Sequence, residues 1–137
     1  MEMKIDFPGG QRVDAHYKGF TIRTDQPESE DGEDSAPSPF DLFLASLGTC
    51  TGYYVLSFCR KRSLDIRGIE LTLATTRDEE KHMLSEISID VRLPHDFPER
   101  YIAAVEKAAS QCTVKKHLFD PPSIKIEAHR GEERDDG

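Results

Sequence analysis

The chain has no excess of basic residues, no long apolar run and few cysteines, and each absence excludes a class of protein. Its 137 residues carry a formal net charge of −8, and the sequence pI is near 5.1. Nucleic acids and anionic membranes bind basic surfaces, so neither is expected as a partner. No apolar run approaches the roughly 20 residues of a membrane span, and the first residues lack the regions of a signal peptide. We therefore expect a cytoplasmic protein.

The three cysteines, Cys50, Cys59 and Cys112, are widely spaced. An odd number at such spacing does not form the disulfide framework of a small secreted domain. The chain has no CxxC pair, so a structural zinc site is not expected, and Cys50, Cys112 and His117 match no common ligand spacing. We predict no metal and no other cofactor. In a reducing cytoplasm these cysteines are either inert core residues or redox-active ones.

The N-terminal part alternates apolar and polar side chains over residues 3–24, which predicts two or three short strands with turns at Gly9–Gly10 and Lys18–Gly19. Residues 25–38 follow with six acids, no base and two prolines. A segment with almost nothing apolar to bury is expected to be a mobile, poorly packed loop.

A long helix is predicted to begin at Ser38–Pro39 and to run to about Arg62. Serine suits the N-cap and proline the first helical position. The apolar residues of this segment lie on nearly all sides of the helix, which indicates a buried central helix.

Alternation returns over residues 66–76 and 84–93, which predicts a hairpin of two strands. A second helix is expected from Asp96, with an apolar stripe that ends at Cys112, and a last strand is expected over residues 123–128. The tail, residues 129–137, is expected to be frayed. The order of elements predicts one domain of α+β class over residues 1–137.

The positions of the cysteines limit how they can pair. Nine residues along one helix place Cys50 and Cys59 on opposite faces, roughly 13 Å apart along the axis, so these two cannot form a disulfide within one chain. Cys50 and Cys112 both lie on inward faces of predicted helices and can plausibly meet. A free cysteine that only packs in the core remains the alternative at this stage.

Two segments resemble the OsmC/Ohr family of peroxide-handling proteins: APSPFDLFLASLGTCTGYYV, around Cys50, and IAAVEKAASQCTVKKHL, around Cys112. The resemblance implies β-sheets wrapped around two central helices in an intertwined homodimer. It implies a thiol-dependent peroxidase of oxidative or osmotic stress protection that acts on organic hydroperoxides. Cys50 would attack the peroxide, Cys112 would resolve the sulfenic acid, and an external dithiol would reduce the disulfide.

The chain departs from the family's efficient peroxidases beside the cysteine. Those enzymes carry a glutamate ten residues before it, where this chain has Phe40, and Asp41 is expected to point away from Cys50 as a helix-capping residue. They also use an arginine from the N-terminal strands, for which Arg23 is the first candidate, ahead of Arg12 and Lys18. The less-characterised OsmC-like branch is therefore the closer match. The alternative function is binding of a small apolar or thiol-reactive ligand without efficient turnover.

Overall fold

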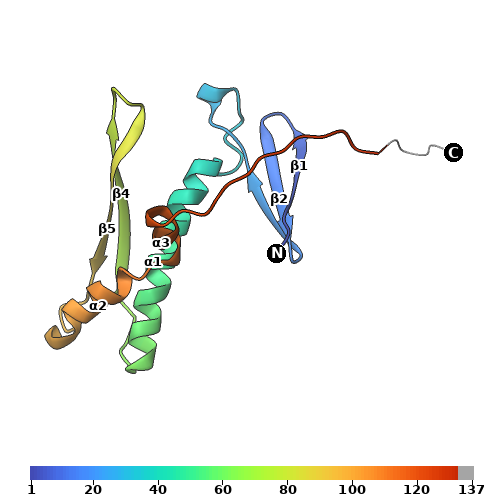
Figure 1. Ribbon diagram of the computed structural model, residues 1–137. Coiled ribbons are helices and arrows are strands. Elements are labelled where there is room, and N and C mark those ends of the chain that lie inside the picture. The colour runs from blue at the N-terminus through green and yellow to red at the C-terminus, as the bar shows by residue number, and fades with distance from the viewer. Residues whose placement is uncertain (133–137) are drawn as a thin grey trace.

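The computed structural model describes residues 1–132 and confirms the α+β class. Three strands come first, followed by a long helix, a two-stranded hairpin and two short helices. Figure 1 shows the long helix α1 between the β4–β5 hairpin on one side and the N-terminal sheet on the other. The elements are β1 Lys4–Gly9, β2 Arg12–Tyr17, β3 Phe20–Thr24, α1 Pro39–Lys61, β4 Glu70–Asp78, β5 Met83–Arg92, α2 Ile102–Ala109 and α3 Thr113–Phe119.

Helix α1 begins where the sequence predicts. The Ser38 hydroxyl accepts a hydrogen bond from the Asp41 backbone N–H at 3.2 Å, and Pro39 occupies the first helical position. Two glycines of α1 face β4: a Cβ atom at Gly48 or Gly52 would lie 3.8 Å from a leucine methyl of that strand, which is ordinary van der Waals contact.

The core lies where α1 meets α2. Val55, Phe58 and Cys59 of α1 and Val105 of α2 are buried together. Leucines, valines and aromatics from β5 and the adjoining loops pack around them. Because α2 is fixed here, the turn that follows it is carried back toward the middle of α1.

By length and composition, α1 could cross a membrane, contrary to the expectation that no run of this chain approaches such a span. The indication is weak, because core helices of soluble proteins meet the same criteria. Here α1 packs against β4, α2 and α3. We therefore interpret α1 as a core helix.

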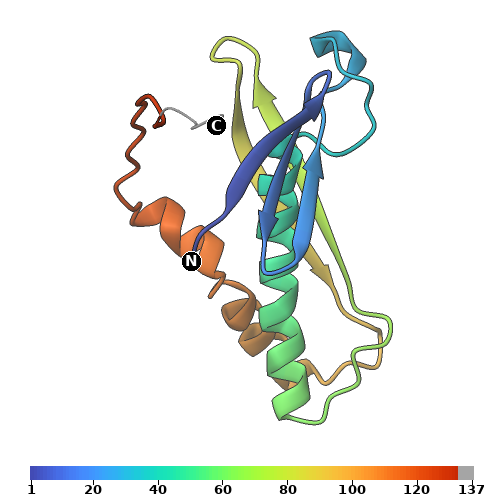
Figure 2. The ribbon, with the colours of Figure 1, turned by 90° about the vertical axis from the view of Figure 1, so that its right-hand side faces the viewer.

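The N-terminal sheet is antiparallel, in the order β1-β2-β3, and it has one apolar and one polar face. Ile5, Ala15 and Ile22 are paired across the three strands and share the apolar face. The sheet makes no extensive contact with the helices or with β4–β5 in the described chain. Figure 2, turned by 90°, shows it in front of α1 as a separate layer, and much of its apolar face is exposed.

The predicted second helix is divided in two, which corrects the sequence analysis. A short 3-10 turn at Glu99–Tyr101 leads into α2, which ends at Ala109. A turn at Ser110 and Gln111 follows, and Cys112 has an extended backbone with φ −47° and ψ 121°. Cys112 therefore does not lie on the stripe of α2. It is the N-cap of the next helix, α3.

The strand predicted over residues 123–128 does not form within the described chain, where residues 121–132 have neither helix nor strand. A strand needs a neighbour for its backbone hydrogen bonds, and none lies beside this segment. Ile124 and Ile126 are 81% and 94% exposed. Of the tail predicted to be frayed, residues 133–137 lie outside the described part.

The acidic segment 25–38 is mostly exposed, and Asp25 is its one buried residue. The Asp25 carboxylate is almost fully buried and accepts hydrogen bonds from the backbone N–H groups of Gln26 and Ser35 and from the Ser35 hydroxyl. The Ser35 hydroxyl, then the two backbone groups, lower the pKa of Asp25 from 3.8 to about 2. One buried carboxylate thus organises a loop that has almost no apolar residue to bury.

Candidate functional site

The structure brings Cys50 and Cys112 together and keeps both as free thiols. Cys50 lies in the middle of α1 and is partly exposed, whereas Cys112 is 1% exposed. The Cys112 side chain is near enough to Cys50 to be one of the groups that lower the pKa of its thiol. The sequence analysis predicted this encounter, although Cys112 reaches it from a helix N-cap rather than from an apolar stripe.

The surroundings of Cys50 favour its thiolate. Burial raises the pKa of the Cys50 thiol, but hydrogen bonds from the Val114 N–H, the Cys112 side chain and the N–H and hydroxyl of Thr113 together lower it below the usual 9.0. All these donors belong to the start of α3. A thiol with a lowered pKa and partial exposure is the form in which cysteine acts as a nucleophile.

Cys112 is held between α1 and α3. Its sulfur accepts the backbone N–H of Lys115 at 3.4 Å, as an N-cap does, and lies 4.0 Å from the Leu47 carbonyl oxygen. Solvent scarcely reaches this sulfur, so its accessible reaction partner is the neighbouring Cys50.

Thr113 was not recognised from the sequence as part of the site. Its N–H and hydroxyl help to lower the pKa of Cys50, and its hydroxyl is also 2.8 Å from the Tyr54 hydroxyl of α1. Tyr54 was not recognised as part of the site either. The available signal was its position four residues after Cys50, which places both side chains on one face of the helix.

Cys59 takes no part in the site. It is fully buried in the core, and its burial raises the pKa of its thiol against the lowering effect of Arg62. Arg62 stacks its guanidinium 3.7 Å from the ring centre of Phe58. The Cys59 thiol is therefore protonated and inert, which fits its interpretation as a packing residue.

Arg23 is not brought to Cys50 within one chain. It lies on the polar face of the N-terminal sheet, paired across the strands with Asp14, and its side chain is exposed. The alternation of β3 explains this position, because Ile22 takes the apolar face. Asp41 lies in the first turn of α1 and is not among the largest causes of the lowered pKa of Cys50, which are burial and hydrogen bonds.

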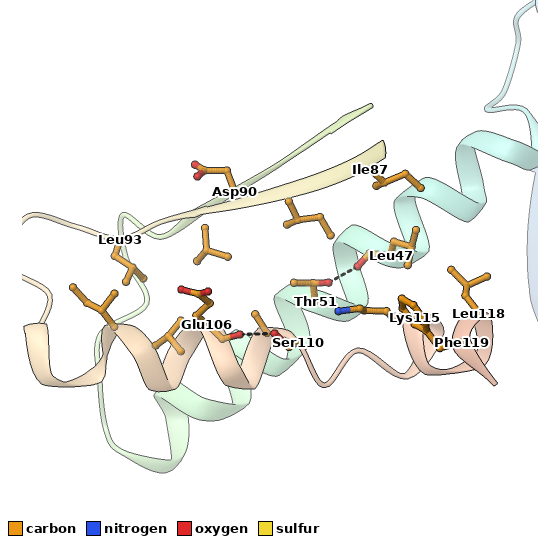
Figure 3. A pocket seen from close by; sticks show the side chains of 15 residues that line it. Leu47, Thr51, Ile87, Asp90, Leu93, Glu106, Ser110, Lys115, Leu118 and Phe119 are labelled. Atoms are coloured by element: carbon orange, nitrogen blue, oxygen red, sulfur yellow. Dashed lines mark hydrogen bonds between the residues drawn. The ribbon is translucent and has the colours of Figure 1, made fainter. Parts of the chain in front are cut away.

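A cavity of about 600 Å³ lies between α1, β5, α2 and α3, and Leu47 and Thr51 of α1 are among the residues that line it. Its walls are mainly apolar, and Figure 3 shows the Lys115 side chain pointing into it. Cys50 does not line this cavity. Its volume suits a small apolar ligand.

One cluster in the described chain has side chains that could ligate a metal. Asp6, Asp14 and His16 place their ligand atoms within 4.8 Å of one another on the polar face of the N-terminal sheet. His16 already bonds Asp6 at 3.0 Å through Nε2 and Thr21 at 3.1 Å through Nδ1. This cluster lies on the sheet that makes no extensive contact with α1, so it has no evident connection with the cysteines.

The sequence profile that describes OsmC-like proteins matches residues 32–127, and the chain belongs to this family. The matched segment contains Cys50, Cys112 and the first turn of α3. No curated protein matches the chain significantly in sequence.

Solved structures share the fold at low sequence identity. A candidate osmotic stress induced and detoxification response protein from Psychrobacter arcticus 273-4 is 24% identical, with a TM-score of 0.72 and coverage of 83% of this chain and 85% of that one. An OsmC like protein from Mycoplasma pneumoniae is 14% identical, with a TM-score of 0.68 over 88% and 87%. The organic hydroperoxide resistance protein OhrB of Bacillus subtilis is 18% identical, with a TM-score of 0.51 over 85% and 90%. These likenesses establish the fold.

Proposed function

We propose that the protein is a thiol-dependent peroxidase that reduces organic hydroperoxides in oxidative or osmotic stress protection. The observation that carries the proposal is a partly exposed Cys50 beside a buried Cys112, whose side chain is among the groups that lower the pKa of the Cys50 thiol. Structural relatives named as hydroperoxide resistance proteins add support.

In the first step the Cys50 thiolate attacks the distal oxygen of the hydroperoxide. An S–O bond forms, the O–O bond breaks, and the alkoxide leaves and takes up a proton to become an alcohol. Cys50 is oxidised to a sulfenic acid while the peroxide is reduced. The hydrogen bonds from Thr113 and Val114 maintain the thiolate that begins this step.

In the second step the Cys112 sulfur attacks the Cys50 sulfenic sulfur. An S–S bond forms, the S–O bond breaks, and hydroxide leaves with the Cys112 proton as water. An external dithiol then reduces the disulfide through a mixed disulfide and is itself oxidised. Because Cys112 is already beside Cys50, resolution can precede further oxidation.

We further propose that the working form is a cytoplasmic, intertwined homodimer. Three apolar surfaces support it: the uncovered face of the N-terminal sheet, the exposed side of α1 around Tyr53, and the segment with Ile124 and Ile126. A second copy could cover the first two and give the third a strand to pair with. A monomer by light scattering at micromolar concentration would contradict this.

The alternative function is binding of a small apolar ligand without turnover. The cavity beside Leu47 favours it, because it is mainly apolar and does not include Cys50. The absence of a charged group among the causes that lower the Cys50 pKa points the same way.

The test is consumption of cumene hydroperoxide with a dithiol reductant by the natural protein, by Cys50→Ser and by the matched control Cys59→Ser. We expect turnover by the natural protein and the control, and its loss in Cys50→Ser. If Cys50→Ser consumes the peroxide as fast as the natural protein, the peroxidase proposal fails. If all three are inactive with several dithiols while folded, the binding function is favoured.

A further inference from the structure

We propose that Tyr54 is a positioning residue for Cys50: its hydroxyl holds the side chain of Thr113, and thereby keeps the first turn of α3 against the Cys50 sulfur. The inference deepens the proposed function and rests on it only in taking Cys50 as the reacting thiol. Tyr54 itself does not touch the reacting atoms.

The geometry is a chain of contacts through one residue. Tyr54 lies four residues after Cys50, and its hydroxyl oxygen is 2.8 Å from the Thr113 hydroxyl oxygen. Hydrogen bonds from the Thr113 N–H and hydroxyl are among the causes that lower the pKa of Cys50. Thr113 is therefore linked to both side chains, and a displacement of its side chain after a change at Tyr54 alters the environment of the thiol.

The site depends on this contact because its donors are neutral. The groups that favour the Cys50 thiolate are the hydrogen-bond donors of Cys112, Thr113 and Val114, and no cation of the described chain is among them. A cation acts over several ångströms, whereas a hydrogen bond weakens steeply as its distance and angle depart from the optimum. The thiol is thus sensitive to small displacements of α3.

Helix α3 needs such a contact. It has only seven residues, it follows an irregular turn, and most of its side chains are exposed. Helices this short are marginal without tertiary contacts. The Tyr54–Thr113 bond and the long contact from the sulfur of the N-cap residue Cys112 to the Leu47 carbonyl oxygen are two of the contacts that tie the start of α3 to α1.

Cys112, Tyr54 and His117 are titratable groups linked to Cys50 or to Thr113. Cys112 is among the groups that lower the pKa of Cys50, and the His117 ring Nδ1 lies 2.7 Å from the Thr113 carbonyl oxygen. The Lys115 side chain points into the cavity, which Cys50 does not line (Figure 3). These groups titrate as well, so the absorbance of a Cys50→Ser protein must be subtracted at each pH to isolate the signal of the Cys50 thiolate.

The experiment measures thiolate ultraviolet absorbance against pH in the full-length protein, for Tyr54→Phe and for the matched control Tyr53→Phe. We expect the pH midpoint of Cys50 ionisation to rise in Tyr54→Phe. Below that midpoint the fraction of thiolate should fall by up to about tenfold, which corresponds to the net contribution of one hydrogen bond. Alkylation at fixed pH should slow by only about two- to threefold, because a more basic thiolate is intrinsically more nucleophilic. The control should match the natural protein.

A double-mutant cycle with Thr113→Val separates positioning from packing. If Tyr54 acts through Thr113, Tyr54→Phe causes no further shift in the Thr113→Val protein, and Thr113→Ser retains the natural midpoint. An unchanged midpoint in Tyr54→Phe, an equal shift in Tyr53→Phe, or additive shifts in the cycle would overturn the proposal. The titration needs no peroxide, so it gives its answer even if the peroxidase proposal fails.

Discussion

Replacing both glycines on the β4 side of α1 with alanine should stabilise the protein. In each case the new Cβ would lie 3.8 Å from a leucine methyl, Leu73 for Gly48 and Leu71 for Gly52, which is ordinary van der Waals contact. Alanine is favoured over glycine in a helix interior by about 1 kcal/mol. We expect Gly48→Ala/Gly52→Ala to gain about 2 kcal/mol, or a rise in Tm of roughly 6 to 10 °C.

Urea denaturation and thermal unfolding measure this gain. Peroxide consumption should not change, because each glycine lies two residues from Cys50, about 200° around the helix axis, on the opposite face of α1. Gly32→Ala is the contrasting variant. A Cβ there would lie 1.9 Å from the Gln26 carbonyl oxygen, so the acidic loop must shift and stability should fall. If the free energy of unfolding of the double variant instead falls by more than about 1 kcal/mol, the described packing of α1 on β4 is refuted. That threshold equals the gain expected from helix propensity at one site.

Three further predictions follow from the site and the loop. In Cys112→Ser, peroxide should drive Cys50 to sulfinic and sulfonic acids, visible by mass spectrometry, because no thiol resolves the sulfenic acid; a sulfenate that persists unchanged would argue against a resolving role. Cys59→Ser should react with peroxide at the natural rate in stopped-flow measurements, since its thiol is buried and protonated. The Asp25 pKa is about 2 in the fold against 3.8 ordinarily, so its carboxylate stabilises the loop above about pH 3.8, and this stability is lost as the pH falls toward 2. Hydrogen exchange of the Ser35 amide should accelerate over that range in excess of its intrinsic pH dependence, and Asp25→Asn should remove this acid step.

The meeting of the two cysteines could be anticipated from the sequence, but its geometry could not. The apolar periodicity from Ile102 predicted a helix that continued to Cys112. The segment Ser110–Gln111 contains no glycine or proline to mark a break, so the turn and the N-cap role of Cys112 passed unnoticed. The donors of α3 that face Cys50 were missed for the same reason.

The start of α1 was predictable because it depends on local chemistry. Ser38 and Pro39 suit the first positions of a helix whatever surrounds them, and the helix begins there. The acidic loop shows the opposite case. Composition describes it as solvated, whereas its one buried carboxylate, Asp25, accepts a hydrogen bond from the backbone N–H of Ser35, ten residues away. Hydropathy carries no signal for such a bond.

The polar face of the N-terminal sheet shows a limit of residue-type reasoning. Arg23 was selected as the first candidate because the family resemblance implies an arginine from the N-terminal strands. The alternation of Ile22 and Arg23 already indicates that only one of them can share the apolar face. The missing strand at residues 123–128 has a different cause, since alternation can predict a strand but cannot supply its neighbour.

The most direct test of the central claim is to treat the reduced protein with one equivalent of cumene hydroperoxide and to map its disulfides by peptide mass spectrometry without reduction. The account predicts a single disulfide, between Cys50 and Cys112, with Cys59 recovered as a free thiol. Recovery of Cys50 as an unmodified thiol after the peroxide has been consumed, or a disulfide that involves Cys59, would contradict it.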